Sequence, residues 1–190
     1  MVQRKDKRLV YVNYDLLEDV ATASRNRGET ITKFLEESLV QALKVTKAGY
    51  DLKQLGDFFE VLYAQRILGG VFVPLDVLNF LTNRALKDDK TSLENVWFEN
   101  GTWHGKYLKE RFGDPVKSLE TFLEVSRWDL SEVEVKHVGA TIRVRCISAV
   151  LSEEATKLLS RFIEGIMQGF DYKLKKCDLL KGMIVMDFAN

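Results

Sequence analysis

The chain has 190 residues, of which 46% are hydrophobic and 29% are charged, as in folded globular proteins of one or two domains. Its 28 basic and 28 acidic residues cancel, which excludes a uniformly basic nucleic-acid binder and leaves only a local basic patch as an option. No apolar run approaches the roughly 20 residues that cross a bilayer, and no secretory signal follows the first residues, so we expect a cytoplasmic protein without membrane contact.

The first 48 residues predict a strand and two helices. Residues 9–13, "LVYVN", have the composition of a strand. A helix follows from about Asp15 and stops at Gly28. A second helix is predicted after Thr30, its expected N-cap, with apolar residues on one face at helical spacing, namely Ile31, Leu35, Leu39, Ala42 and Val45.

This N-terminal unit is incomplete by itself. A lone strand has unpaired backbone groups on both edges, and two helices of this size bury too little apolar area to be stable alone. The simplest solution is a homodimer in which the two strands pair antiparallel above four helices.

The order of strand, helix, glycine and Thr-capped helix, over about residues 7–47, resembles the ribbon-helix-helix DNA-binding domains of the Arc/MetJ type. The matching residues are "RLVYVN", the turn "RNRG", and Thr30 with Thr32. The resemblance implies that the two-stranded ribbon enters the major groove of double-stranded DNA and that the start of the second helix holds a phosphate. The residues then expected to contact DNA are Lys5, Lys7, Arg8, Leu9, Tyr11, Asn13, Thr30, Thr32 and Lys33.

Two features leave the DNA contact open. A slip of one residue in the ribbon would turn Arg8, Val10 and Val12 outward in place of Lys7, Leu9 and Tyr11. Glu29 adds a negative charge beside the expected phosphate position. The alternative is a unit that only dimerises, although the basic residues Arg4, Lys5, Lys7 and Arg8 favour a phosphate partner.

Helices dominate the middle of the chain. Gly49 separates the second helix from a helix at 52–68, so we expect domains at 1–48 and 71–190 joined by a linker helix at 49–70. Pro74 lies near the start of the next helix, and Thr91 with Glu94 suggests a capping box for the one after it. That helix ends at Gly113, with Trp97, Gly101, Gly105, Leu108 and Phe112 on one face, and a short helix follows over "DPVKSLETFLEVSRW".

The last third alternates between polar and apolar residues. A hairpin is predicted around Gly139, with Val133, Val135 and His137 on one face of its first strand, and Ile142, Val144 and Cys146 on one face of its second. Ser152 caps a helix that ends near Phe170, and two strands close the chain around Lys181 and Gly182. The fold class is therefore α+β, with helices packed on an antiparallel sheet.

Residues from about 71 to 188 resemble the 4-vinyl reductase, or hydrocarbon-binding, domains, which are similar in fold to haem-NO-binding sensors and TRAPP trafficking subunits. The pattern consists of "FENGTWHGKYLKERFG", "SRWDLSEVEV", the hairpin with Cys146, "RFIEGIMQGF" and "CDLLKGMIVMDF". The resemblance implies an apolar pocket for a small hydrophobic ligand, with Trp103, His104, Tyr107 and Trp128 as candidate pocket residues. Ordinary core packing is the alternative for these aromatics and for both histidines.

The glycine pairs 101/105 and 165/169 each clear one helix face, for which we expect close helix–helix or helix–sheet packing. Cys146 and Cys177 are expected to be buried free thiols rather than zinc ligands, and no cofactor is expected. No nucleophile–base arrangement is recognisable, so we expect no enzyme.

Together these features predict a homodimeric, ligand-responsive transcriptional regulator. The alternative is a ligand-binding or scaffold protein in which the ribbon only dimerises. The sequence names neither the ligand, nor the operator, nor the sign of regulation.

Overall fold

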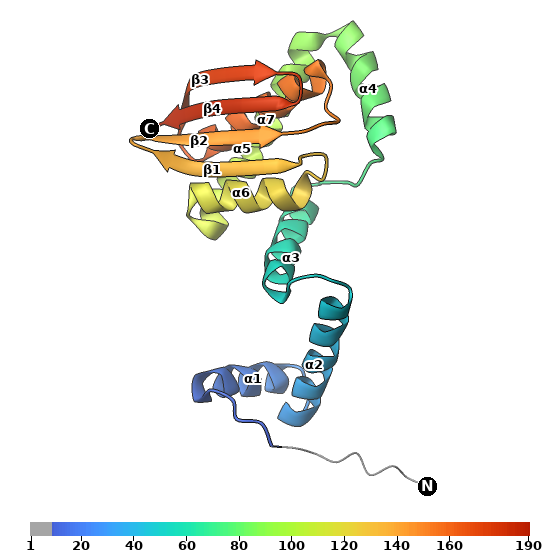
Figure 1. Ribbon diagram of the computed structural model, residues 1–190, viewed down its shortest axis with the longest axis vertical. Coiled ribbons are helices and arrows are strands. Elements are labelled where there is room, and N and C mark those ends of the chain that lie inside the picture. Colours follow the sequence, from blue (N-terminus) through green and yellow to red (C-terminus); the bar gives the residue numbers. More distant parts are fainter. Residues whose placement is uncertain (1–8) are drawn as a thin grey trace. The chain divides into compact units, whose positions relative to one another are not determined.

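The computed structural model describes residues 9–190 (Figure 1). The predicted DNA contacts Lys5, Lys7 and Arg8 lie outside the described residues. In the described residues a run of helices comes first, and an antiparallel sheet with one more helix follows, which confirms the α+β class. In order the elements are α1 (Tyr14–Asn26), α2 (Ile31–Lys47), α3 (Leu52–Ile67), α4 (Leu75–Asp88), α5 (Lys90–Phe112), α6 (Pro115–Ser126), β1 (Glu132–Val138), β2 (Thr141–Ile147), α7 (Glu153–Gly169), β3 (Lys173–Leu180) and β4 (Met183–Ala189).

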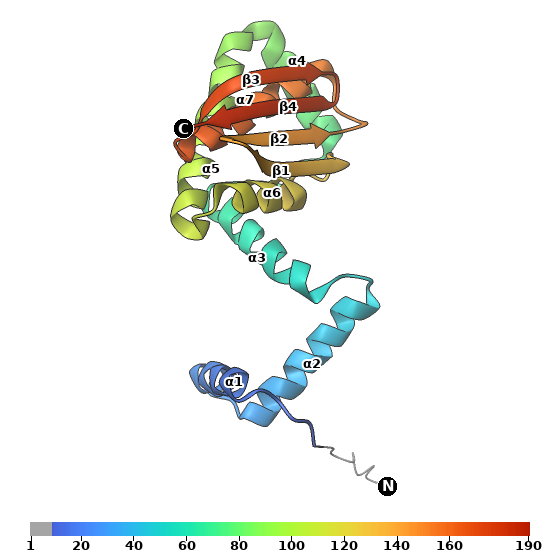
Figure 2. The ribbon, with the colours of Figure 1, turned by 60° about the vertical axis from the view of Figure 1, so that its left-hand side comes forward.

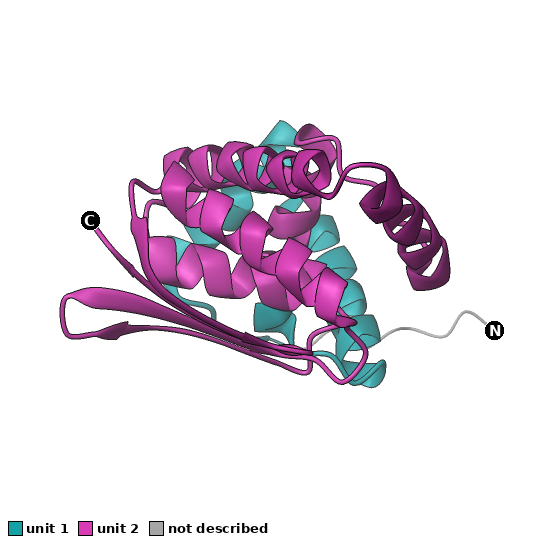
Figure 3. Cartoon of the chain, turned by 90° about the horizontal axis from the view of Figure 1, so that it is seen from above, with its two compact units in different colours: residues 1–55 teal, residues 56–190 magenta. Residues whose placement is uncertain are grey.

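The chain divides into two compact units, residues 1–55 and residues 56–190, coloured separately in Figure 3. The division falls within α3, inside the segment 49–70 that the sequence predicts as a linker helix. Most of α3 therefore belongs with the second unit. Each unit is described by itself below, as unit 1 and unit 2.

The two helices of unit 1 lie where the sequence predicts them, and Thr30 is the predicted cap of the second. The Asn13 side chain accepts a hydrogen bond from the backbone N–H of Asp15 and caps α1. Gly28 follows α1 in the left-handed conformation, with φ +66°, which a residue with a Cβ rarely adopts. The Thr30 hydroxyl accepts from the backbone N–H of Lys33 at 3.2 Å and caps α2, as expected.

Residues 9–13 form no strand within the single chain, contrary to the strand expected there. A β-strand is defined by backbone hydrogen bonds to a neighbouring strand. The four strands of unit 2 pair with one another, and none of them pairs with residues 9–13. Pairing of this segment with a second copy therefore remains a prediction.

Unit 2 contains a four-stranded sheet of order β1-β2-β4-β3, with every neighbouring pair antiparallel (Figure 2). The predicted hairpin at Gly139 is confirmed, with Val138 paired to Thr141. Alternate residues of β2 and β4 are buried, and they form the sheet side of the core: Ile142, Val144, Cys146, Ile184, Met186 and Phe188. The two closing strands around Lys181 and Gly182 are confirmed as β3 and β4.

Helices α6 and α7 cover one face of this sheet, and α5 packs on these two helices (Figure 2). Helix α6 packs on β1, and α7 packs on β3 and β4, while α5 lies against α7 and α6. Ser152 caps α7 by accepting from the backbone N–H of Ala155, as predicted. The buried face of α7 contains Leu158, Leu159, Phe162, Ile163, Ile166 and Met167, and these residues join the sheet and α6 into one core.

Helices α5 and α7 approach each other through their glycines. A methyl group at Gly101 or Gly105 would collide with the α7 backbone carbonyl oxygens of Phe162 or Ile166. A methyl group at Gly165 would collide with the α5 carbonyl of Phe98, and one at Gly169 would meet the α5 backbone at Gly105. The expected close packing is confirmed, and its partner is a helix.

Three local predictions are wrong. The N-cap of α5 is Asp89, whose carboxylate accepts from the backbone N–H of Ser92 at 2.9 Å, so Thr91 and Glu94 form no capping box. His137 is exposed, because the last residues of β1 extend beyond the helices that bury Val135. Cys177 is also exposed, because it lies on the edge strand β3.

Candidate functional site

Unit 1 has almost no interior of its own. Among its described residues, 9–55, Ser24 alone is buried. Both helices nevertheless carry apolar side chains, and many of these are exposed: Tyr14, Leu16 and Leu17 on α1, and Ile31, Leu39, Val40 and Leu43 on α2. A large exposed apolar patch marks an interaction site in soluble proteins, and these side chains on two neighbouring helices supply the residues for one.

The segment before α1 is open to solvent. Leu9 is 86% exposed and Tyr11 is 93% exposed, so both predicted contact residues are free to meet a partner. Asn13 lies at the end of the same segment, where its side-chain oxygen already caps α1. Its amide N–H₂ group keeps its two donors, and these suit an acceptor on a base edge or a phosphate.

The start of α2 brings together the other predicted DNA contacts. Thr30, Thr32 and Lys33 are all exposed there, and backbone N–H groups of a first helical turn favour an anion. Glu29, the acid beside this position, pairs with Arg27 at 3.3 Å. Arg27 thus offsets the charge of Glu29, while Lys33 pairs with a second acid, Glu37, at 3.8 Å.

The four candidate pocket residues of unit 2 do not share one cavity. Trp103 is 66% exposed, with the Lys106 ammonium 5.2 Å from its ring centre. Trp128 is 70% exposed and stacks on Phe72, with the ring centres 6.0 Å apart. Tyr107 is half-buried on α5. Trp103 and Tyr107 lie four residues apart on α5, Trp128 follows α6, and none of the three lines the cavity described below.

His104 is a core residue. It is 4% exposed, and its ring meets Phe122 and Phe162 edge-on, at centre distances of 5.5 and 5.1 Å. Its Nδ1 lies 2.9 Å from the Asn100 carbonyl oxygen and donates to it. Burial lowers the pKa of His104 despite that hydrogen bond, so the ring is neutral near pH 7. The ring and its two phenylalanines fill the space between α5, α6 and α7.

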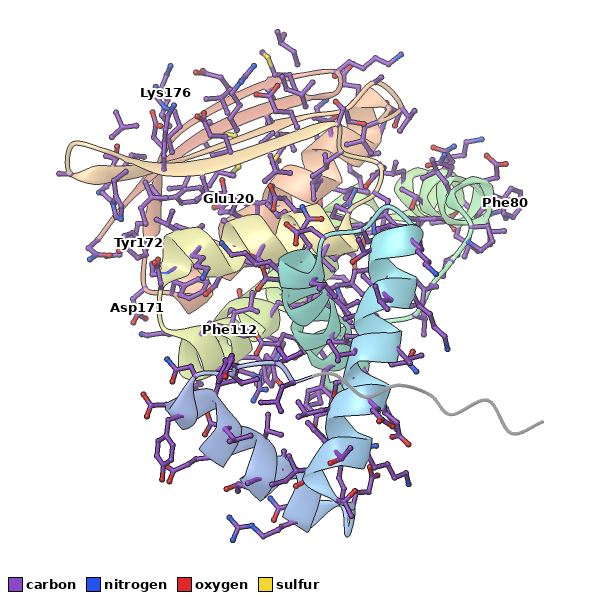
Figure 4. The ribbon with its side chains drawn as sticks, turned by 60° about the horizontal axis from the view of Figure 1, so that its bottom comes forward. Phe80, Phe112, Glu120, Asp171, Tyr172 and Lys176 are labelled. Atoms are coloured by element: carbon purple, nitrogen blue, oxygen red, sulfur yellow. The ribbon has the colours of Figure 1, made fainter. Side chains whose placement is uncertain are left out.

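A cavity of about 130 Å³ lies instead between α3, α5 and α6 of unit 2. Its inner wall is apolar and consists of Val61, Leu108 and Phe112, the last of these at the C-terminal end of α5 (Figure 4). Its polar lining consists of Asp57, Glu60, Asp114, Lys117, Ser118 and Thr121. Ser118 is 7% exposed, and its hydroxyl has no hydrogen-bond partner.

Sequence reasoning did not identify this cavity. One signal was present: Ser118 lies four residues before Phe122, on the face of α6 that also buries Leu119 and Leu123. A serine on an otherwise apolar face indicates either a local helix bond or a polar neighbour. The walls from α3 and α5 come from residues 47 or more positions apart, and no local pattern predicts their meeting.

Neither cysteine is a metal ligand in the part of the chain that the structure describes. Burial raises the pKa of Cys146 to about 12, so this thiol is protonated and unreactive. Cys177 lies exposed on β3, and both cysteines are free. Within residues 9–190, no three His, Cys, Asp or Glu side chains come together in a metal-binding group. In the same part of the chain, no helix is both long and apolar enough to cross a membrane.

No family model and no curated protein sequence matches the chain. The chain is weakly similar to solved structures, and two of these are described here. One comes from work on the molecular mechanism of H-NOX activation, with 13% identity, a TM-score of 0.39, and coverage of 70% of this chain and 91% of that chain. The other comes from work on heme distortion in the H-NOX family, with 15% identity, a TM-score of 0.39, and coverage of 72% and 91%. Similarity at this level supports no functional inference.

Proposed function

We propose that the chain is a homodimeric transcriptional regulator of the cytoplasm, which binds double-stranded DNA through unit 1 and a small ligand through unit 2. The observation that carries the proposal is the apolar surface of unit 1, where two capped amphipathic helices bury only Ser24 among the described residues. A second copy supplies the missing surface.

The hydrophobic effect favours the dimer. Leu39 is 63% exposed and Leu43 is 57% exposed, and burying either side chain would lower the free energy by roughly 1 kcal/mol. Two copies that bury these faces against each other would recover that free energy. They would also pair residues 9–13 as a ribbon, which satisfies the free backbone groups of both segments.

Such a dimer would place the ribbon side chains and the start of α2 where they could contact DNA. The ribbon would expose side chains beside the basic residues Lys5, Lys7 and Arg8, and the major groove admits a two-stranded ribbon. The capped start of α2, with Thr32 and Lys33, offers N–H donors and a positive charge to a flanking phosphate. Together the parts form one surface that both positions and reads DNA.

The salt dependence of DNA binding tests this proposal. Fluorescence anisotropy would follow labelled fragments of the upstream region of the protein's own gene, at several salt concentrations. We expect the double variant Lys7→Ala/Arg8→Ala to lose two phosphate contacts per protomer, so that the slope of log K against log[salt] falls by roughly 2 to 4 for the dimer. Affinity should fall at least about 10-fold near 150 mM salt.

The matched control is Lys44→Ala/Lys47→Ala, which removes the same charge from the exposed C-terminal end of α2. The proposal expects a smaller change in slope for this control. Equal slopes for the two variants, or wild-type binding no tighter than to random DNA, would contradict the regulator role.

A second candidate is a dimeric scaffold or ligand-binding protein without DNA affinity. The exposed side chains of Leu9 and Val10 favour it, because apolar side chains contact base edges poorly except at thymine methyl groups. This candidate predicts a stable dimer whose anisotropy signal on any duplex disappears at physiological salt.

A further inference from the structure

Helix α3 has apolar side chains on two opposite faces. Val61 and Ala64, on one face, are buried in the core of unit 2. Phe59, Tyr63 and Ile67 follow one another at intervals of four residues and are 62%, 53% and 52% exposed. At 3.6 residues per turn, Tyr63 lies about 160° around the helix from Val61. These three side chains therefore form a stripe that faces away from the core, called the α3 stripe below.

The α3 stripe has an acid along one edge and a base along the other. Glu60 lies about 60° from Tyr63 in one direction around the helix, and Arg66 lies about 60° from it in the other. Both charged side chains are exposed, and neither forms an ion pair with another described residue. Arg111 of α5 lies 5.8 Å from the centre of the Tyr63 ring and fixes its position. An apolar stripe with opposite charges on its two edges is complementary to a second copy of itself.

The spacing of the α3 stripe determines how two copies would pack. Side chains four residues apart form a ridge, and two such ridges interdigitate when the helix axes cross at about 50°. A two-fold axis along the ridge then places Glu60 of one copy beside Arg66 of the other, once on each side. If the second helix ran in the opposite direction, Glu60 would face Glu60 and Arg66 would face Arg66. The charges therefore favour two α3 helices that run in similar directions.

The area of the α3 stripe indicates which kind of dimer it can belong to. Each of its three side chains exposes roughly 100 Å², since a fully buried aromatic side chain covers about 150–250 Å². Two copies would bury roughly 600 Å² through these side chains, about half of the area at which stable interfaces begin. The stripe is thus too small to hold a dimer alone, and it fits a second contact in a dimer that is also held elsewhere.

We propose that the α3 stripe is a second contact of the homodimer, in which α3 packs on α3 of the other copy with Tyr63 nearest the two-fold axis and Glu60 paired with Arg66 of the other copy. The inference rests on the homodimer proposed above, because the stripe adds to the contact through unit 1 and does not replace it. It also brings unit 2, the part proposed to bind the ligand, into the dimer contact.

Disulfide cross-linking of the full chain tests the contact. Phe59→Cys and Ile67→Cys are each made in a Cys177→Ser background, which removes the exposed native thiol, while Cys146 is buried and has a pKa of about 12. Both new cysteines lie on the ridge, so each would meet its own copy at the roughly 5–6 Å between Cα atoms that a disulfide spans. We expect a mild oxidant to cross-link both variants at least about 10-fold faster than the control.

The matched control is Phe80→Cys in the same background. Phe80 is an aromatic residue of α4 that is 73% exposed and lies off the α3 stripe (Figure 4). A mixture of Phe59→Cys and Ile67→Cys, after subunit exchange, separates the two directions of packing. Helices that run in similar directions link each cysteine to its own kind, whereas opposite directions would link Phe59→Cys to Ile67→Cys.

A charge exchange tests the pair across the two-fold axis. Glu60→Arg should raise the dimer Kd about 5-fold, because it replaces two attractive pairs with two repulsive ones at exposed positions. Adding Arg66→Glu restores both pairs with the charges exchanged, so the double variant should return to within about 2-fold of the wild-type Kd. Sedimentation velocity measures all three values.

The results separate this contact from the dimer through unit 1. Stripe cysteines that link no faster than Phe80→Cys, in a sample that sediments as a dimer, would overturn the α3 contact and leave the dimer through unit 1 standing. Preferential linking in the mixture, or no rescue by the double charge variant, would also overturn the proposed arrangement. Fast stripe links in a dimer that persists in Leu39→Glu would support the α3 contact and contradict the contact on α2. Loss of DNA binding in the anisotropy measurement changes none of these outcomes.

Discussion

The two units each contain a pair of neighbouring helices, and the two pairs differ in how they are completed. In unit 2, α5 and α7 meet glycine to backbone and bury Leu108 and Ile166 within one core. In unit 1, α1 and α2 have clear caps, yet they leave their apolar faces open. The difference teaches that good local helix signals fix where helices begin and end, while interior packing must come from elsewhere in the chain or from a second copy.

The largest effect is expected from a substitution that disrupts the packing of α5 on α7. Gly105→Ala would push a methyl group into the Ile166 carbonyl of α7, and since backbone cannot move aside cheaply we expect unit 2 to lose about 3 kcal/mol or more of unfolding free energy. Urea unfolding followed by tryptophan fluorescence measures this directly, because Trp97, Trp103 and Trp128 all lie in unit 2.

The control for that prediction is Gly56→Ala, in the interior of α3. Its added methyl group would meet no atom within 4 Å, so the change should stabilise the helix by about 0.5–1 kcal/mol through its better helix propensity. A similar loss for both variants would show that the glycine contacts do not set the packing of α5 on α7.

The next largest effect is expected from a substitution on α2 of unit 1 that weakens the proposed dimer. Leu39→Glu places a charge on the exposed apolar face of α2, and burying that charge in a dimer is costly. We expect the dissociation constant of the dimer to rise at least about 100-fold, which corresponds to about 2.7 kcal/mol. Sedimentation velocity over a range of concentrations measures it.

The matched variant is Gln41→Glu, which adds the same charge to an exposed polar position of α2. Its dimer should persist at wild-type concentrations. If the Leu39 and Gln41 variants dissociate alike, the apolar face of α2 is not the dimer contact.

The smallest effect concerns pH and belongs to unit 2. Arg127 donates two hydrogen bonds to the Asp129 carboxylate, at 2.8 and 2.6 Å. Desolvation acts to raise the pKa of Asp129, but the charge and hydrogen bonds of Arg127 outweigh it and lower that pKa. The pair therefore stabilises the fold above the unfolded-state pKa of about 4, and that contribution is lost as the pH falls through the lower folded-state value.

We expect Asp129→Asn to cost about 1 kcal/mol at pH 7 and to flatten the loss of stability below pH 4. Urea midpoints at a series of pH values check this. Glu99→Gln, at an exposed position of α5, serves as the control and should keep the wild-type pH profile. An unchanged acid profile in the Asp129 variant would contradict the role of the pair.

The sequence predicted several features that are determined locally, although the capping box expected at Thr91 and Glu94 does not form because Asp89 caps α5 instead. Thr30 and Ser152 cap their helices as expected, and the hairpin at Gly139 forms as expected, because a cap or a tight turn depends on a few consecutive residues. The close packing predicted from the two glycine pairs is found between α5 and α7, because glycines four residues apart lie on one helix face.

Features that depend on distant segments were not predictable in the same way. His137 lies on the same face of β1 as the buried Val135, but the last three residues of this strand are exposed. Trp103 and Trp128, which were predicted to line a pocket, are exposed, and the cavity lies instead where α3, α5 and α6 meet. Composition shows which side chains prefer burial, but not which of them the fold has room to bury.

Hydrogen exchange at the backbone amides of residues 9–13 tests most directly the claim that a second copy completes unit 1. In the single chain these residues form no strand, so an unpaired segment exchanges at nearly the rate of an unfolded peptide. We predict that amides on the paired edge of this segment exchange at least about 100-fold more slowly in the wild-type dimer, and that Leu39→Glu abolishes this protection. Unprotected amides in a sample that sediments as a dimer would contradict the ribbon.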